Sequence, residues 1–130
     1  MFLGAAAFAQ APPVATATPA KPSAFKNLKI FPAEIPRDRL IAIMKGYTVS
    51  LGVKCTFCHV GVEGKRETMD FASDANPRKD IARTMMAMTR RLNEQDFAVK
   101  DFTQLKVGCY TCHRGAAKPL TAAPDPTVAS

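Results

Sequence analysis

Apolar side chains recur at helical spacing in the stretch that follows Pro36. The pattern predicts a helix from about Pro36 to Leu51, because proline suits a first helical position and Gly52 provides a stop. One face of this helix carries Leu40, Met44, Thr48 and Leu51. Gly46 lies inside the helix, where it costs about 1 kcal/mol relative to alanine but leaves room for a flat ring to approach the backbone.

A second helix is predicted from Asn76 to about Asn93. Asn76 is expected to cap it, and Pro77 fits its first turn. Its apolar stripe consists of Ile81, Met85, Met88 and Leu92. Lysine and arginine occupy much of the remaining surface, which is typical of a solvated helix face. Gly61 and Gly64 predict a turn-rich loop after the first histidine of the chain, at position 59. Residues 94–106 are expected to form a connector with a short helix near 96–105, and no alternating pattern predicts a strand.

Two copies of one short motif contain every cysteine and histidine of the chain. They read Cys-Thr-Phe-Cys-His at 55–59 and Cys-Tyr-Thr-Cys-His at 109–113. Cys-x-x-Cys-His is the signature for covalent attachment of a c-type haem. Two thiols at this spacing can reach the two vinyl groups on one edge of a porphyrin, and the histidine is then held beneath the iron. The predicted attachment residues are Cys55, Cys58, Cys109 and Cys112, with His59 and His113 as iron ligands.

Paired cysteines also have other uses, which the motif spacing leaves open. Four sulfur or nitrogen ligands can hold a structural zinc ion, and Cys-x-x-Cys pairs can form redox dithiols or disulfides. None of these sites requires a histidine directly after the second cysteine, yet both copies have one. The duplicated motif therefore favours two covalently bound c-type haems over a zinc or disulfide protein.

Methionines are the candidates for the sixth iron ligands. A low-spin haem iron needs a second strong axial ligand, and the chain has no third histidine. Met44, on the apolar face of the helix before Cys55, is the candidate for the first haem. Met85 is favoured for the second haem because its helical setting repeats that of Met44, and Met88 is the alternative. Each of them also suits core filling, a common use of methionine.

The two ends of the chain differ in composition from its middle. Residues 1–9 have the character of the end of a secretory signal peptide, and residues 10–27 form a tether rich in proline, alanine and threonine. Residues 28–120 are expected to form a dihaem cytochrome c domain, and residues 121–130 a flexible tail. The two units of helix, loop and motif span about 36–61 and 76–115. The predicted fold class is mainly α, with little or no β-structure, packed around two covalent haems.

The net charge and the predicted cellular location indicate what kind of partner the protein has. The formal net charge is +7, and the four propionates of two haems would lower it to about +3. A mild positive excess suits docking to redox proteins with acidic surfaces, whereas the scattered lysines and arginines argue against nucleic acid. The N-terminal apolar run is too short to span a bilayer. A secretory signal and covalent haem both indicate the periplasm or the cell surface.

A longer set of positions around the two motifs is similar to a known family. These positions are Leu40-x-x-x-Met44, Leu51-Gly52-Val53-x-Cys55-x-x-Cys58-His59, Phe71-Ala72-x-Asp74, Ala82-Arg83-x-Met85-x-x-Met88, Asn93, Cys109-Tyr110-Thr111-Cys112-His113-Arg114-Gly115 and Lys118-Pro119-Leu120. Over about 28–120 the chain resembles the photosynthetic reaction-centre tetrahaem cytochrome c subunit family. It looks like half of such a subunit, with one pair of haem units instead of two.

The resemblance implies a mostly helical fold in which helices lie nearly parallel to the haem planes and donate methionine. It supports the pairs His59/Met44 and His113/methionine. In the family, one haem takes a distant histidine as its sixth ligand, and this chain has no third histidine.

The expected function is single-electron transfer between redox partners, without bond chemistry on a substrate. The chain would act as a free carrier or as a subunit of a membrane-associated complex or haem assembly. A haem enzyme or sensor with an open iron site, such as a peroxidase, is the alternative from another class. That alternative needs a vacant axial position, and the sequence has no histidine left to serve such a site on its distal side.

Overall fold

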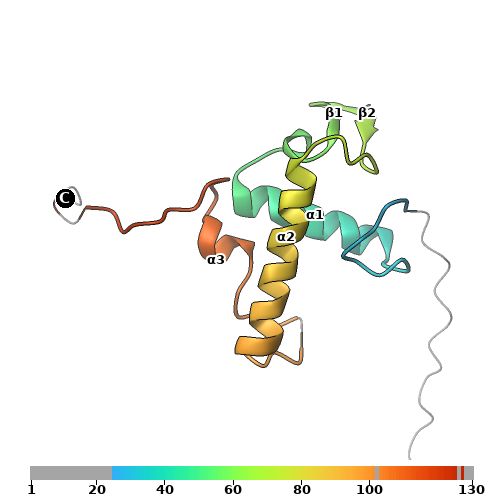
Figure 1. Ribbon diagram of the computed structural model, residues 1–130. Helices are drawn as coiled ribbons and strands as arrows, with labels where there is room; N and C mark the ends of the chain where they lie inside the picture. Colours follow the sequence, from blue (N-terminus) through green and yellow to red (C-terminus); the bar gives the residue numbers. More distant parts are fainter. Residues whose placement is uncertain (1–24, 102, 126, 128–130) are drawn as a thin grey trace, which may run out of the picture.

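The chain folds into short helical elements and one small hairpin. The computed structural model describes residues 25–101, 103–125 and 127, so the predicted signal segment and most of the predicted tether lie outside the described residues. In chain order the elements are α1 (Arg37–Leu51), the 3-10 helix η1 (Cys55–Phe57), β1 (Val60–Val62), β2 (Lys65–Asp70), α2 (Arg78–Arg91), the π-helix η2 (Leu92–Asp96) and α3 (Cys109–His113). Figure 1 shows that α1 and α2 cross one another. The hairpin of β1 and β2 lies near the start of α2, and α3 lies beside α2. The predicted mainly α class is confirmed.

Helix α1 begins and ends where its flanking residues predict. Pro36 precedes the helix with φ −58° and ψ 138°, and its fixed φ leads into the first turn. Gly52 ends the helix in the left-handed conformation (φ 64°), and its N–H bonds to the carbonyls of Thr48 and Val49. A side chain at Gly52 would also collide with the backbone carbonyl of Gly115. The predicted helix is confirmed to within one residue at its start.

The segment after His59 is a β-hairpin, where the sequence predicted a loop. Strand β1 pairs with β2 in antiparallel fashion, with Val60 opposite Asp70 and Val62 opposite Lys65. Nearly every side chain of both strands is exposed. A hairpin that is solvated on both faces leaves no apolar alternation in its sequence, and β2 reads Lys-Arg-Glu-Thr-Met-Asp. The expectation of a loop here is therefore wrong, although the amount of β-structure is small.

Helix α2 starts as predicted but ends differently. The side-chain oxygen of Asn76 accepts a hydrogen bond from the backbone N–H of Arg78 at 3.1 Å, so Asn76 caps the first turn as expected. The helix ends at Arg91 and continues as the π-helical turn η2. The short helix predicted near 96–105 does not form in the described part of that segment. None of the helices in the described ranges has the length and apolar character that a bilayer span requires.

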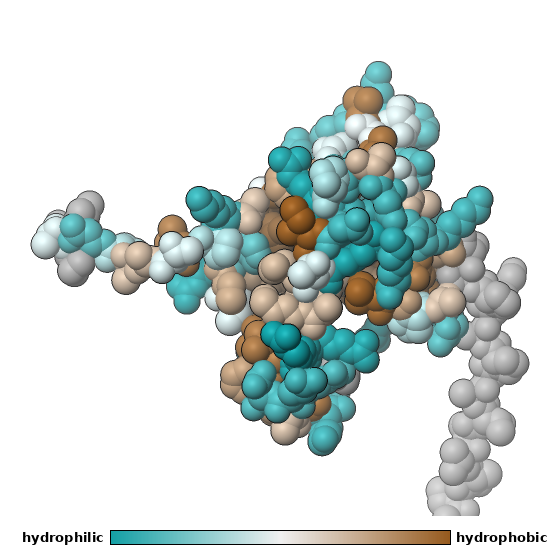
Figure 2. All heavy atoms as spheres, in the orientation of Figure 1, coloured by the Kyte–Doolittle hydropathy of each residue, from teal (hydrophilic) through white to brown (hydrophobic). Residues whose placement is uncertain are grey.

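The polypeptide by itself buries very little apolar surface. Among the described residues, the buried large apolar side chains are Ile35 and Leu40, each 7% exposed. Ile81 and Met85, from the predicted apolar stripe of α2, are 60% and 37% exposed. Figure 2 shows apolar side chains reaching the surface between hydrophilic ones on the face drawn. A small chain whose helix stripes stay uncovered lacks the core that normally stabilises a domain of this size.

Polar interactions at Asp74 join the segment before α1 to the start of α2. The carboxylate of Asp74 accepts from Lys29 Nζ at 2.8 Å, Arg83 Nη2 at 2.9 Å and Asn27 Nδ2 at 2.9 Å. Lys79 Nζ lies 3.3 Å from the same carboxylate and also donates to the backbone carbonyls of residues 71–73. Because these donors, Arg83 foremost, stabilise the charged form, the pKa of the Asp74 carboxyl lies far below its ordinary value.

Replacing Asp74 by asparagine is expected to destabilise the fold at neutral pH and to reduce its sensitivity to acid. A carboxyl whose folded-state pKa is depressed stabilises the fold above the unfolded-state pKa of about 3.9, and this contribution is lost as the pH falls toward the folded-state pKa. Wild type and Asp74→Asn should therefore differ in unfolding free energy at neutral pH, and the difference should shrink progressively as the pH falls below about 4. Urea unfolding followed by circular dichroism across this range measures the difference.

Asp80→Asn is the matched control, because the exposed Asp80 carboxylate also pairs with Arg83 but lies outside the contact with the N-terminal segment. Its effect should be smaller and should depend less on pH. A gap between wild type and Asp74→Asn that stays constant through the acid range would contradict the prediction.

Candidate haem-binding sites

The first motif lies in a tight turn directly after α1. Its opening residues form η1, and the N–H of His59 donates to the carbonyl of Cys55 at 2.9 Å. The ring of His59 is half-buried and meets the edge of Phe71, with the ring centroids 5.2 Å apart and an angle of 68° between the planes. Asn76 Nδ2 donates to the carbonyl of Phe57 at 3.0 Å, which ties this turn to the start of α2.

The imidazole of His59 is held in the form that binds a metal. Burial lowers the pKa of His59, and the nearby charge of Lys79 lowers it further, while the backbone of Phe71 opposes the shift. The neutral ring therefore predominates at neutral pH, and a neutral ring nitrogen is the one that coordinates iron. The Nδ1 atom is buried and makes no hydrogen bond. A ring with an unpartnered buried nitrogen fits a site that a further group completes.

The second motif forms a short helix of its own, α3. Gly108 N–H donates to Thr111 Oγ1 at 3.0 Å before the helix, and Arg114 ends it in the left-handed conformation (φ 51°). His113 Nδ1 lies 2.9 Å from the carbonyl oxygen of Ala116. Since a carbonyl oxygen can only accept, Nδ1 is the donor in this contact, and Nε2 is the ring nitrogen left to bind iron. The donor set of the second motif therefore fits a c-type haem.

The four cysteine side chains form no bond with one another. Each is a free thiol, and burial raises the pKa of the Cys58 and Cys109 thiols. Redox-active Cys-x-x-Cys pairs have lowered pKa values, so this environment is the opposite of theirs. Within the described ranges, no three cysteine, histidine or carboxylate side chains converge as they would around a metal ion. The two pairs lie in separate elements, each beside its own histidine.

Asn93 joins the turn η2, which continues α2, to the segment before the second motif. It is 1% exposed, and its amide makes four hydrogen bonds. Its Nδ2 donates to the carbonyls of Thr89 and Val107, each at 2.7 Å, and its Oδ1 accepts from the N–H groups of Lys106 at 2.8 Å and Val107 at 3.1 Å. Only Gly108 separates residues 106–107 from the second motif, so η2 and the start of α3 are held in one fixed arrangement.

Helix α1 also contacts the second motif. The N–H of Gly115 donates to the carbonyl of Ser50 at 2.9 Å, and Gly52 packs directly on Gly115. On the same helix, burial raises the pKa of Tyr47 to about 12, with the nearby Cys109 thiol as the second cause. The sequence associated the first helix with the first motif only, and no local pattern indicated this second contact.

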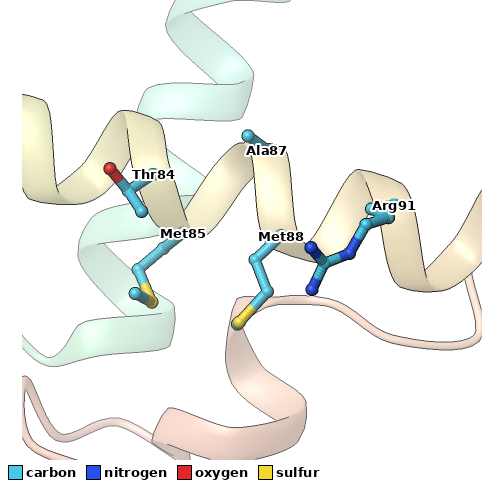
Figure 3. Close-up of a pocket in the computed structure, with 5 residues that line it drawn as sticks. All are labelled: Thr84, Met85, Ala87, Met88 and Arg91. Carbon is cyan, nitrogen blue, oxygen red and sulfur yellow. The ribbon is translucent and has the colours of Figure 1, made fainter.

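The predicted methionine ligands lie on the two long helices. Met44 is half-buried on α1. Met85 and Met88 line a cavity of about 450 Å³ along α2. Thr84, Ala87 and Arg91 complete the lining of this cavity. Figure 3 shows both methionines projecting from the same side of α2, toward the side on which α3 lies. The structure thus brings both alternative ligands to one groove facing the second motif.

The sequence as a whole matches one protein family. Residues 9–123 match the family model described as photosynthetic reaction centre cytochrome C subunit. The chain belongs to this family. The predicted resemblance is confirmed, and it covers most of the chain.

Two relatives in this family show how much of a full-length subunit the chain represents. It is 41% identical over 98 residues to the photosynthetic reaction center cytochrome c subunit of Roseobacter denitrificans, covering 73% of this chain and 25% of that protein. It is 31% identical over 96 residues to the subunit of the same name from Rubrivivax gelatinosus, covering 64% of this chain and 24% of that protein. The chain thus spans about a quarter of the length of these relatives, not the half that the sequence suggested.

Replacing Asn93 by alanine is expected to destabilise the fold by about 3 kcal/mol, because buried carbonyl and N–H groups lose their partners. The local effect should centre on the segment before the second motif. Amide hydrogen exchange at Lys106 and Val107 should become faster, since both N–H groups donate to Asn93. Asn76→Ala is the control, because Asn76 ties the first motif instead. Unchanged protection of Lys106 and Val107 in Asn93→Ala would contradict the assignment.

Proposed function

We propose that this chain is a dihaem c-type cytochrome that carries single electrons between redox partners outside the cytoplasm. The observation that carries the proposal is the pair of Cys-x-x-Cys-His motifs, each folded into its own turn or helix. Membership of a family of cytochrome c subunits supports it. The haem supplies a one-electron couple, and the protein sets its spacing, orientation and potential.

The residues that would hold the two haems come from both motifs. Cys55 and Cys58 would form thioether bonds to the first haem, and Cys109 and Cys112 to the second. His59 and His113 would be the axial ligands contributed by the motifs. Met44 is proposed as the sixth ligand of the first iron, and Met85 or Met88 as that of the second.

The uncovered apolar surface supports a large apolar cofactor. Ile81 on α2, Tyr110 on α3 and Val49 on α1 are 60%, 59% and 71% exposed, so each of these three helices leaves a large apolar side chain uncovered. Apolar surface of this extent is normally covered by a partner or a ligand. A porphyrin joined to each motif would provide such a cover and would stabilise the small domain.

The partners and location are proposed from charge and from the relatives. The two relatives are subunits of photosynthetic reaction centers by name. We propose by analogy that this chain serves an electron-transfer complex at the periplasmic side of a membrane. Its positive formal charge of +7 suits partners with acidic docking surfaces.

Haem stoichiometry tests the proposal directly. Protein produced in a host with a cytochrome c maturation system should contain two haems per chain by the pyridine haemochrome assay. Replacing Cys55 and Cys58 by alanine should leave one haem, and replacing Cys109 and Cys112 should leave the other. A wild-type ratio near one, or zinc in place of haem by elemental analysis, would reject the dihaem function.

Methionine substitutions test the sixth ligands. Loss of a thioether ligand should lower the potential of one haem and open its iron to carbon monoxide. Met44→Ala should do this for one haem, and either Met85→Ala or Met88→Ala for the other. Met86→Ala is the matched control from the same helix and should change neither potential. Optical redox titration and carbon monoxide binding measure the effects.

Rapid carbon monoxide binding by reduced wild-type protein would overturn the methionine ligation of at least one iron. It would favour the haem enzyme or sensor, because only a vacant axial position admits the gas. Unchanged potentials in both Met85→Ala and Met88→Ala would reject the ligand assignment at the second site and leave the haem count unaffected.

A further inference from the structure

Arg91 is the one charged residue among those lining the groove beside Met85 and Met88. The lining residues all come from α2, and Arg91 lies at the C-terminal end of the groove. Figure 3 shows its guanidinium turned back along the helix toward Met88. The groove therefore has thioether and small side chains along its length and a cation at one end.

The other cations on α2 already have partners, which are carboxylates except at Arg78, whose guanidinium lies over the ring of Phe57. Lys79 and Arg83 pair with Asp74, and Arg90 Nε lies 2.8 Å from Glu94 Oε1. Arg91 makes no ion pair with any residue in the described part of the chain. An unpaired guanidinium at the end of a groove is suited to a carboxylate on whatever fills that groove, because its planar fork matches carboxylate geometry in two parallel hydrogen bonds.

The position of Arg91 in the fold identifies which haem the groove would hold. Arg91 lies two residues before Asn93, whose amide holds residues 106–107 directly ahead of the second motif. The charged end of the groove is thus the end of α2 that is fixed to the second attachment site. A porphyrin bound at Cys109 and Cys112 carries two carboxylates of its own as propionates.

We propose that Arg91 binds a propionate of the second haem and raises the reduction potential of that haem. The proposal rests on the dihaem function proposed above and adds a positioning residue to it. A fixed positive charge near the iron disfavours the oxidised state, which carries one more positive charge than the reduced state. The same ion pair would fix the orientation of the porphyrin on α2 relative to Met85 and Met88.

Three variants separate this role from a general effect of surface charge. Arg91→Gln removes the charge but keeps a polar side chain of similar size. Arg91→Lys keeps the charge but loses the two-pronged geometry. Arg90→Gln removes the adjacent arginine, which pairs with Glu94 and does not line the groove. Each variant is purified as the holoprotein, its haem content is measured, and both midpoint potentials are determined by optical redox titration.

Arg91→Gln is expected to shift the one-electron equilibrium of one haem about tenfold toward oxidation, equivalent to about 59 mV. The haem affected should be the one whose potential responds to Met85→Ala or Met88→Ala. Arg91→Lys should retain most of the wild-type potential, and Arg90→Gln should leave both potentials unchanged. The proposal would be supported equally if Arg91→Gln failed to load the second haem while keeping normal helical circular dichroism. In that case Arg90→Gln should still carry two haems.

Equal shifts in Arg91→Gln and Arg90→Gln, or no shift in either, would overturn the role of Arg91. With two haems still present in these variants, the dihaem function itself would stand. A wild-type protein that carries fewer than two haems would instead reject the dihaem function, and the role of Arg91 with it.

Discussion

The buried amide of Asn93 is the interaction on which the arrangement of the second site depends. It uses its two donors and two acceptor positions on the backbone of Thr89, Lys106 and Val107. These bonds connect the end of α2 to the residues just before α3, so the methionines of α2 and the thiols of α3 hold a fixed relation. Any other side chain at this position would leave buried backbone groups without partners.

Polar connections of this kind replace the apolar core that a domain of this size would normally have. Ile35 and Leu40 are the buried apolar side chains in the described ranges, while the stripe of α2 faces outward or into its groove. The first motif is tied by Asn76, the second by Asn93, and the segment before α1 by Asp74. The helices are therefore positioned by hydrogen bonds, and their apolar faces stay free to receive a covalently attached ring.

Local signals in the sequence predict the features that local chemistry determines. Pro36 and Gly52 delimit α1, Asn76 caps α2, and the spacing within each motif is itself the site. The hairpin was missed because β2 is exposed on both faces and has no apolar alternation. The π-helical turn after α2 was missed because its backbone bond, from the N–H of Phe97 to the carbonyl of Leu92, leaves no pattern of apolar positions in the sequence. The role of Arg91 was hidden because sequence alone cannot distinguish it from Arg90, which is paired with Glu94.

The two histidine rings have different hydrogen bonds and neighbouring charges, although they belong to motifs of the same pattern. The His113 ring donates to the carbonyl of Ala116, and such a bond increases the electron donation of the other ring nitrogen to a metal. The His59 ring has no hydrogen bond at Nδ1. It lies near the cation of Lys79, which disfavours any further positive charge on the ring or on a metal bound to it. Two irons bound at these rings would therefore feel unequal ligand fields and charges. Unequal potentials favour movement of an electron in one direction between the two sites, so a near-repeat in sequence can produce a directional carrier.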